Sequence, residues 1–225
     1  MADLFEYLNF EVDVKDDLTR KEIEDAIIDF SEKLQNNSYD ICAVCIMSHG
    51  DNNLIEGSDG YMVDIENDIF HKFSNDYCRS MRGKPKLFVF QACRGTEKDP
   101  GYLTKSDATR ATTDAPGAPQ RVASVLEDAI MAYPCIPDYA AWRNEASGSH
   151  FITRLCKIFK KHAATPLEIN DMLNKVTQSL KEVTVKVIEN KEYKEYKITP
   201  TRESRLGKKL FFKPKDSNTE CCVIV

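Results

Sequence analysis

Cys93 and His49 are the two residues of this chain whose type and placement suit nucleophilic catalysis. Cys93 closely follows a short run of five β-prone residues over 86–90, and His49 closely follows a second apolar run, Ile41–Met47. A cysteine thiolate attacks carbonyl carbons, and an imidazole takes and returns a proton near neutral pH. The pair therefore predicts hydrolysis of a peptide bond by a cysteine nucleophile, and the alternatives are an ordinary loop histidine and an inert core cysteine.

The two apolar runs have the composition of buried strands in a parallel sheet, because both faces of such strands are covered. Open α/β sheets bind their ligands at the carboxyl ends of the strands. We therefore expect the two strands to end side by side, with Cys93 and His49 at one edge of the sheet. The backbone N–H groups of Gly50 and Cys93 are then the expected donors to the oxyanion of peptide hydrolysis.

The composition limits the classes of function. The chain has 225 residues, of which 42% are apolar, and this is enough for a full α/β core. A net charge of −5 without a long basic block argues against nucleic acid as a partner. No run reaches the roughly 18 apolar residues of a membrane span, and the first residues are acidic, unlike a signal peptide. We expect a cytoplasmic protein without firm membrane association, whose eight cysteines are reduced.

Cys42 and Cys45 form a C-x-x-C pair, a spacing that metal sites also use. They lie within a predicted strand, where side chains three residues apart face opposite sides of the sheet and cannot converge on one ion. Buried small side chains are therefore the preferred interpretation of both. No metal and no cofactor are predicted. Cys93 alone combines a strand end, a following glycine and a candidate base.

Helical and strand patterns alternate along the chain, which predicts an α/β fold. An amphipathic helix capped by Thr19 or Asp17 is expected before the His49 strand, and a small hairpin and a short helix over 64–73 are expected after it. The segment 165–168 has the pattern of a capping box for a later helix. The remaining expected elements are a helix end over 2–8, strands over 9–14, 125–133 and 206–213, and helices over 148–164 and 166–183.

Several ordered segments of this chain resemble segments of the caspase family. They are Gln91-Ala92-Cys93-Arg94-Gly95, Ser48-His49-Gly50, and the stretches over 17–23, 79–87, 142–144 and 148–151. The resemblance covers nearly the whole chain. It implies a three-layer α/β fold, in which a mostly parallel, six-stranded central sheet is flanked by helices and a cut in a linker separates a large from a small subunit.

The resemblance also implies a pocket for a substrate aspartate, held by two arginines and a glutamine. Gln91 and Arg143 match two of these residues by motif, and Trp142 and Asn144 belong to the segment that resembles the substrate groove. From the residues alone, Gln91 is equally a strand residue, Arg143 a solvated charge and Trp142 a core residue. The other arginine of the family pocket has no counterpart in this sequence.

The chain divides into three parts by the same resemblance. These are a part over 1–114 like a large subunit, a part over 115–213 like a small subunit, and a flexible tail over 214–225. Proline, glycine and threonine over 96–122 predict an exposed linker. Asp107 and Asp114 precede alanines within it and are the expected processing sites. The last four residues have the form of a prenylation signal at Cys222, although an unmodified tail is preferred because valine is an unusual last residue.

The family's first strand also lacks a counterpart, and it would lie between the strands over 9–14 and Ile41–Met47. The sheet is therefore expected to close up, to borrow a strand or to leave two edges unpaired. The strand over 206–213 resembles the one through which caspases pair, which implies a homodimer or a heterodimer with another caspase.

The expected function is that of a cysteine endopeptidase, made as a zymogen, which cleaves protein substrates after aspartate in apoptotic or related signalling. The alternative is a caspase-like regulator with weak catalysis that binds other caspases. The intact pair of Cys93 and His49 favours the enzyme, and the missing first strand favours the regulator.

Overall fold

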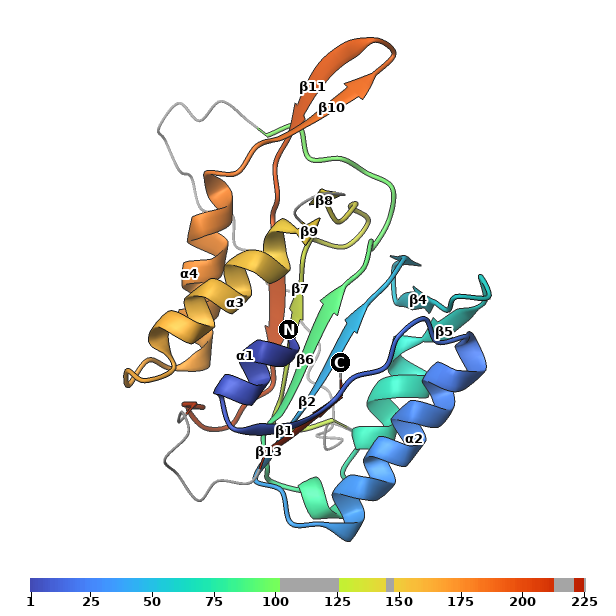
Figure 1. Cartoon of the computed structure of the whole chain (residues 1–225), viewed down its shortest axis with the longest axis vertical. Helices are drawn as coiled ribbons and strands as arrows, with labels where there is room; N and C mark the ends of the chain where they lie inside the picture. The colour runs from blue at the N-terminus through green and yellow to red at the C-terminus, as the bar shows by residue number, and fades with distance from the viewer. Residues whose placement is uncertain (102–125, 145–147, 213–220, 225) are drawn as a thin grey trace, which may run out of the picture.

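A computed structural model describes residues 1–101, 126–144, 148–212 and 221–224 of the chain. Its centre is a sheet of six strands with helices on both faces (Figure 1), so the expected three-layer α/β fold is confirmed. The strand order is β1-β13-β2-β6-β7-β12. These strands are β1 (Phe10–Asp13), β13 (Cys221–Ile224), β2 (Ile41–Met47), β6 (Lys86–Gln91), β7 (Ala129–Tyr133) and β12 (Thr201–Ser204). Neighbours run parallel except β12, which pairs antiparallel with β7.

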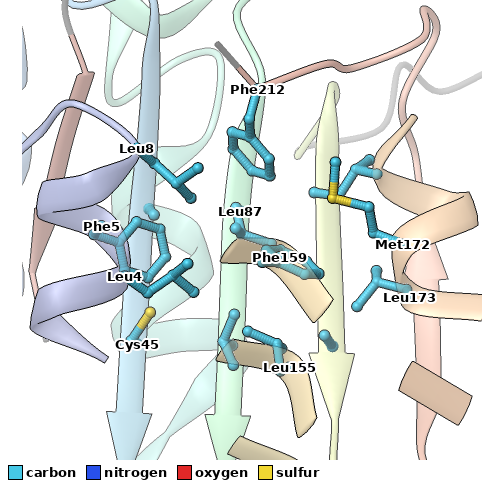
Figure 2. Packing of buried hydrophobic residues seen from close by; sticks show 14 of the residues in the cluster. Leu4, Phe5, Leu8, Cys45, Leu87, Leu155, Phe159, Met172, Leu173 and Phe212 are labelled. Carbon is cyan, nitrogen blue, oxygen red and sulfur yellow. The ribbon is translucent and has the colours of Figure 1, made fainter. Parts of the chain in front are cut away.

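Three helices cover one face of the sheet: α1 (Ala2–Tyr7), α3 (His150–His162) and α4 (Ile169–Lys181). Their apolar sides meet the strands in a single core cluster, in which α1 lies over β2 and α3 over β6 (Figure 2). Phe5, Leu155 and Phe159 are fully buried there. Burial of side chains of this size contributes about 1.5–3 kcal/mol each to folding, so this cluster fixes the helices on the sheet.

The opposite face is covered by α2 (Arg20–Asn36) and a series of short turns, Ile65–Ile69, Phe70–Phe73 and Arg79–Met81. Thr19 caps α2 and forms a capping box with Glu22, as expected. The helix expected over 64–73 is instead one wide π-type turn followed by a tighter 3₁₀ turn. Residues three apart eclipse in a 3₁₀ turn, and this brings the rings of Phe70 and Phe73 onto Phe88, with ring centroids 4.8 and 5.4 Å away.

The described residues form three smaller sheets beyond the central one. The hairpin expected after His49 is present as β3 (Gly50–Asp51), β4 (Leu54–Glu56) and β5 (Met62–Asp64), all antiparallel. β8 (Arg143–Asn144) pairs with β9 (Gly148–Ser149). β10 (Val185–Glu189) and β11 (Glu192–Tyr196) form a projecting hairpin that the sequence interpretation missed (Figure 1).

The prediction of a strand over 206–213 is wrong. Residues 205–212 form no strand, and the edge of the sheet is β12, which lies just before them. The apolar pattern has another cause, because Leu206, Leu210 and Phe212 pack as irregular chain against the core below the sheet. Phe212 stands 6.2 Å from Phe10 and 5.7 Å from Phe159, measured between ring centroids.

The capping box expected over 165–168 is also wrong. Glu168 is itself the N-cap of α4, and its carboxylate accepts a hydrogen bond from the backbone N–H of Asn170 over 2.8 Å. Thr165 instead donates its hydroxyl hydrogen to the carbonyl of His162, at the end of the preceding helix. The helix therefore begins later than the sequence pattern suggested.

The flexible tail expected over 214–225 is wrong for Cys221–Ile224, which form β13 between β1 and β2. This is the position where the resemblance left a gap, so the sheet borrows a strand from its own chain. Residues 213–220 and 225 lie outside the described part. Cys42 and Cys45 face opposite sides of the sheet, as expected, since each belongs to a different core cluster.

Residues 96–101, at the start of the predicted linker, are attached to the body of the protein. The N–H of Glu97 donates to the carbonyl of Asp138 over 2.9 Å, and the N–H of Lys197 donates to the carbonyl of Asp99 over 2.9 Å. The rest of the linker lies outside the described residues. None of the described helices is both long enough and apolar enough to cross a membrane.

Candidate active site

The register of β2 with β6 brings the His49 and Cys93 segments to one edge of the sheet. Met47 at the end of β2 pairs with Gln91 at the end of β6. The N–H of Ser48 then donates to the carbonyl of Gln91 over 3.1 Å, which carries the pairing one step further. Because both segments leave parallel strands at the same level, the imidazole and the thiol belong to the same rim of the sheet.

Gly50 is packed tightly between the β4 strand and the turn that carries Cys93. A Cβ at this position would stand 2.4 Å from the carbonyl oxygen of Leu54, 3.1 Å from Cβ of Ala92 and 3.3 Å from the carbonyl oxygen of Cys93. A side chain there would separate the His49 segment from the turn that carries Cys93. Glycine is therefore required for the local geometry, which is compatible with the role predicted for its N–H.

Backbone bonds to a second segment hold the turn that carries Cys93. Arg94 donates from its N–H to the carbonyl of Tyr139 over 3.0 Å, and its own carbonyl accepts from the N–H of Asp138 over 2.8 Å. The N–H of Ala141 donates to Sγ of Cys93 over 3.3 Å. This bond links the sulfur to the segment that also holds the backbone of Arg94.

Cys93 differs from the neighbouring cysteines in its exposure. It is partly exposed, whereas Cys45 and Cys135 are buried. Burial raises the pKa of Cys135 to about 11 and raises the pKa of Cys45 as well, so both are protonated and unreactive at neutral pH.

Arg143 contacts His49 directly. Its Nη2 lies 3.1 Å from Nε2 of the imidazole, and both side chains belong to exposed residues. An arginine only donates, so Nε2 is the acceptor and a neutral imidazole in this arrangement carries its proton on Nδ1. The structure thus joins a candidate pocket residue to the candidate base.

Ser149 connects the other candidate pocket residue to the same place. Gln91 is buried, with 7% of its surface exposed, and its Oε1 accepts a hydrogen bond from the hydroxyl of Ser149. Ser149 also pairs with Arg143 across β8 and β9 and caps α3 by accepting from the N–H of Ile152 over 3.2 Å. This role of Ser149 is not apparent from the sequence, because only the folded chain brings Ser149 to Gln91.

Trp142 lies beside the hairpin of β10 and β11. Its ring stacks on that of Tyr196, with centroids 5.1 Å apart and planes 15° apart. Lys98 lies over both rings and forms an ion pair with Glu189, which also accepts from the Tyr196 hydroxyl over 2.8 Å. The ring of Trp142 therefore packs against the β10–β11 hairpin. Neither the hairpin nor this contact is expected from the sequence.

Asn144 is exposed at the end of β8, next to Arg143. Asp107 and Asp114, the expected processing sites, lie outside the described residues. The catalytic, oxyanion, pocket and processing roles of all these residues stay predictions.

A cavity of about 400 Å³ opens at this edge of the sheet, between α2, the carboxyl end of β2 and the β4–β5 hairpin. His49 and Arg143 line it on one side, and Ile224 at the end of β13 lines it on another. Its further lining includes Lys15, Asp17, Met47, Ser48 and Glu56. Both signs of charge therefore face this space, beside apolar side chains of α2 and β2.

Comparisons with known proteins agree with this architecture. A family model described as "Caspase domain" matches residues 1–211. Caspase-3 of Bos taurus is 36% identical over 213 residues, which are 94% of this chain and 74% of the relative. Caspase-3 of Oryctolagus cuniculus is 37% identical over 94% of this chain and 73% of the relative, and Caspase-7 of Gallus gallus is 34% identical over 92% and 66%. With its sheet, its Cys93 and His49 strand ends and a match along nearly its whole length, the chain belongs to the caspase family.

Proposed function

We propose that this chain is a cysteine endopeptidase that cleaves protein substrates after aspartate, is made as a zymogen and acts in apoptotic or related signalling. The observation that carries the proposal is the parallel register of β2 and β6, which directs His49 and Cys93 to one edge of the sheet. The membership of the caspase family supports a protease of the cysteine type. The proposal includes a cytoplasmic location for the chain.

In the proposed reaction, the thiol of Cys93 gives its proton to His49, and the thiolate sulfur attacks the carbonyl carbon of the scissile bond. The N–H groups of Gly50 and Cys93 donate to the oxyanion. His49 then returns the proton to the leaving amine, which departs and leaves a thioester on sulfur. A water molecule, deprotonated by His49, hydrolyses the thioester and frees the thiol.

Selection of aspartate rests on the connection between Gln91, Ser149 and Arg143. The carboxylate accepts charge-assisted bonds from the guanidinium of Arg143 and a bond from the amide NH₂ of Gln91, whose oxygen is already bonded to Ser149. The same carboxylate attracts Arg143 away from Nε2 of His49 and frees that lone pair for the thiol proton. Binding of the correct substrate thereby prepares the base.

A regulator of other caspases is the second candidate function, and the contact between Arg143 and His49 favours it. In this arrangement the lone pair of Nε2 is already engaged. The chain would then bind a caspase and cut little by itself.

A dimer, with a second copy or with another caspase, is proposed to form along β12. The strand pairs with β7 on one side and lies at the edge of the six-stranded sheet. Arg202 and Glu203 are exposed on it. Charges on an edge strand oppose pairing with unmatched strands and favour a partner that places opposite charges across from them.

Peptide reporters that differ only in the residue before the cut test the two functions. The enzyme is expected to prefer aspartate over asparagine, and the turnover should vanish in Cys93→Ala and in His49→Ala. Cys156→Ala is the matched control, because Cys156 is also a partly exposed cysteine and lies in α3. Cleavage by a folded Cys93→Ala protein contradicts the assignment of the nucleophile. Failure of the unchanged, folded chain to cleave any reporter contradicts the enzyme, and capture of an added caspase then supports the regulator.

A further inference from the structure

β13 fills a seam between β1 and β2, two strands that do not pair with each other in the described part of the chain. Its four residues pair in parallel with Phe10–Asp13 on one side and with residues 41–44 on the other. Without β13, two facing strand edges would expose unpaired backbone N–H and C=O groups. The seam is therefore a site for one short parallel strand.

The seam places apolar side chains on both faces of the sheet. Val223 is completely buried and joins Cys221 in the core cluster under α1, beside Leu8. Ile224 points to the opposite cluster, which contains Ile27 of α2. A charged side chain in place of Val223 would enter an apolar core without a partner, so the seam discriminates by side-chain chemistry as well as by backbone pairing.

Occupancy of the seam bears on the candidate site. β13 pairs with β2 as far as Val44, while β2 continues to Met47, and His49 follows two residues later. Ile224 lines the same cavity of about 400 Å³ as His49 and Arg143. The strand that positions the candidate base is thus held on one side by β13.

The strand in the seam can come from the same chain or from a second copy of the protein. The geometry favours the same chain. Phe212 and Cys221 precede and follow residues 213–220, and both line one cavity of about 210 Å³, together with Phe10 and Ile41. The two ends of this connection therefore lie close to each other. A short tether with neighbouring ends keeps the strand at a high effective concentration beside the seam.

We propose that Cys221–Ile224 is a docking strand that switches the candidate site. When docked, it holds β2 and supplies the Ile224 wall of the cavity. When released, it exposes two strand edges and removes the support of the His49 strand. The ligand class that the seam binds is an extended apolar tetrapeptide running parallel to β2. The docking itself stands on the sheet alone, and only its effect on turnover rests on the proposed peptidase function.

Hydrogen exchange of the full chain tests the docking without any activity measurement. In Val223→Asp, the amides of β1 and of residues 41–44 that face β13 are expected to exchange at least about tenfold faster than in the parent, because local opening of the seam removes their partners. The N–H of Cys42 donates instead to the carbonyl of Pro85 and should keep its protection. Ile188→Asp is the control, since Ile188 lies in β10 and is 64% exposed. Equal protection of β1 and β2 in Val223→Asp and in the parent would overturn the proposal.

A chain that is cut after folding separates docking from the ability to fold. A site for a sequence-specific protease is inserted within residues 213–220, and the folded protein is then cleaved. The released C-terminal piece is expected to stay bound and to exchange with a labelled peptide of residues 218–225, followed by fluorescence anisotropy. The same peptide with Val223→Asp should not bind. Immediate loss of the piece, with unchanged exchange of β1 and β2, would count against docking.

Turnover of the aspartate reporter by the cut chain gives the second readout. Removal of the piece is expected to lower turnover at least about tenfold, in line with loss of positioning of a catalytic group, and added peptide is expected to restore it. Unchanged turnover after complete removal would overturn the switch. Absence of turnover in both the parent and the cut chain would contradict the proposed function, while the exchange data would still decide the docking.

Discussion

Arg143 donates a hydrogen bond from Nη2 to Nε2 of His49 across 3.1 Å. The guanidinium therefore occupies the lone pair with which an imidazole accepts the proton of a thiol. In the proposed function, a substrate carboxylate would compete for the same guanidinium. This one contact would then connect recognition of the substrate charge with activation of the base.

Replacement of Arg143 by glutamine is expected to lower kcat/KM for an aspartate peptide by at least about 100-fold, because loss of one partner of a close charge pair costs about 2–5 kcal/mol. The preference for aspartate over asparagine should disappear with it. Arg79→Gln, at an exposed arginine in a distant turn, is the control and should match the parent. A parent-like ratio of the two peptides in Arg143→Gln would show that another residue reads the carboxylate.

Replacement of Gly50 by alanine is expected to lower the free energy of unfolding by about 1–3 kcal/mol, because its Cβ would stand 2.4 Å from the carbonyl oxygen of Leu54. Turnover should fall more than stability explains, since the His49 segment moves away from Cys93. Gly207→Ala is a matched control, where the nearest atom to the new Cβ is Oδ1 of Asp128 at 3.6 Å. Chemical denaturation and reporter assays on the same samples measure both quantities. Gly50→Ala with the stability and turnover of the parent would contradict this steric role of Gly50.

Alkylation with iodoacetamide at neutral pH is expected to modify Cys93 before Cys78, Cys135 and Cys156. Burial raises the pKa of Cys78 and of Cys156 and holds Cys135 at about 11, so these groups have little thiolate at pH 7. Peptide mapping by mass spectrometry follows the order of modification. Earlier modification of Cys135 than of Cys93 would contradict the observed difference in exposure.

Glu189 is expected to titrate far below the usual range of a glutamate. Hydrogen bonds from Lys98 and Tyr196 lower its pKa to about 2. Because this folded value lies below the ordinary value of about 4.3, the carboxylate stabilises the hairpin fully above about pH 4.3, and the contribution is lost as the pH falls toward 2.

The fluorescence of Trp142, the single tryptophan, measures this titration, since its ring stacks on Tyr196. The parent should show a transition between about pH 4 and pH 2 that Glu189→Gln lacks. Glu195→Gln, in the same hairpin, should keep it. The same transition in Glu189→Gln would assign it to another group.

Processing is expected after Asp114 in the linker, because proteases cleave exposed, extended chain and Pro116 opposes helix formation on the far side. Incubation with an active caspase, followed by intact-mass measurement, should give fragments that end at Asp114. Asp114→Ala should abolish this cleavage, and Asp107→Ala should not. Cleavage of both variants at a third position would refute this assignment.

The strands that carry the candidate site could be predicted from the sequence almost to the residue. Residues 41–45 of β2 and all of β6 are buried, so each side chain there must be apolar or have its polar groups hydrogen-bonded. This produces a nearly continuous apolar pattern in the sequence. The contact of Arg143 with His49 could not be predicted, because it depends on the path of β8 in three dimensions. The same holds for Ser149, whose partner Gln91 is distant in sequence.

The remaining errors have a common physical cause. β12 is polar, since it lies at the sheet edge with most of its residues exposed, and it carries none of the periodicity that identifies a strand. The apolar segment after it packs as irregular chain, which a pattern of hydrophobic residues does not distinguish from a strand. β13 is too short to give a signal, and its seat exists only after β1 and β2 are in place.

The position of β13 also sets an order of assembly on the ribosome. β1 and β2 are synthesised early, yet the strand that lies between them comes after every other described element. Contacts between residues so far apart in sequence form slowly, because a long loop must close first. A nascent chain therefore carries Cys93 and His49 long before its sheet is closed. Synthesis of β13 is the step that fills the seam between β1 and β2, so a nascent chain that still lacks this strand has no β13 support on its His49 strand.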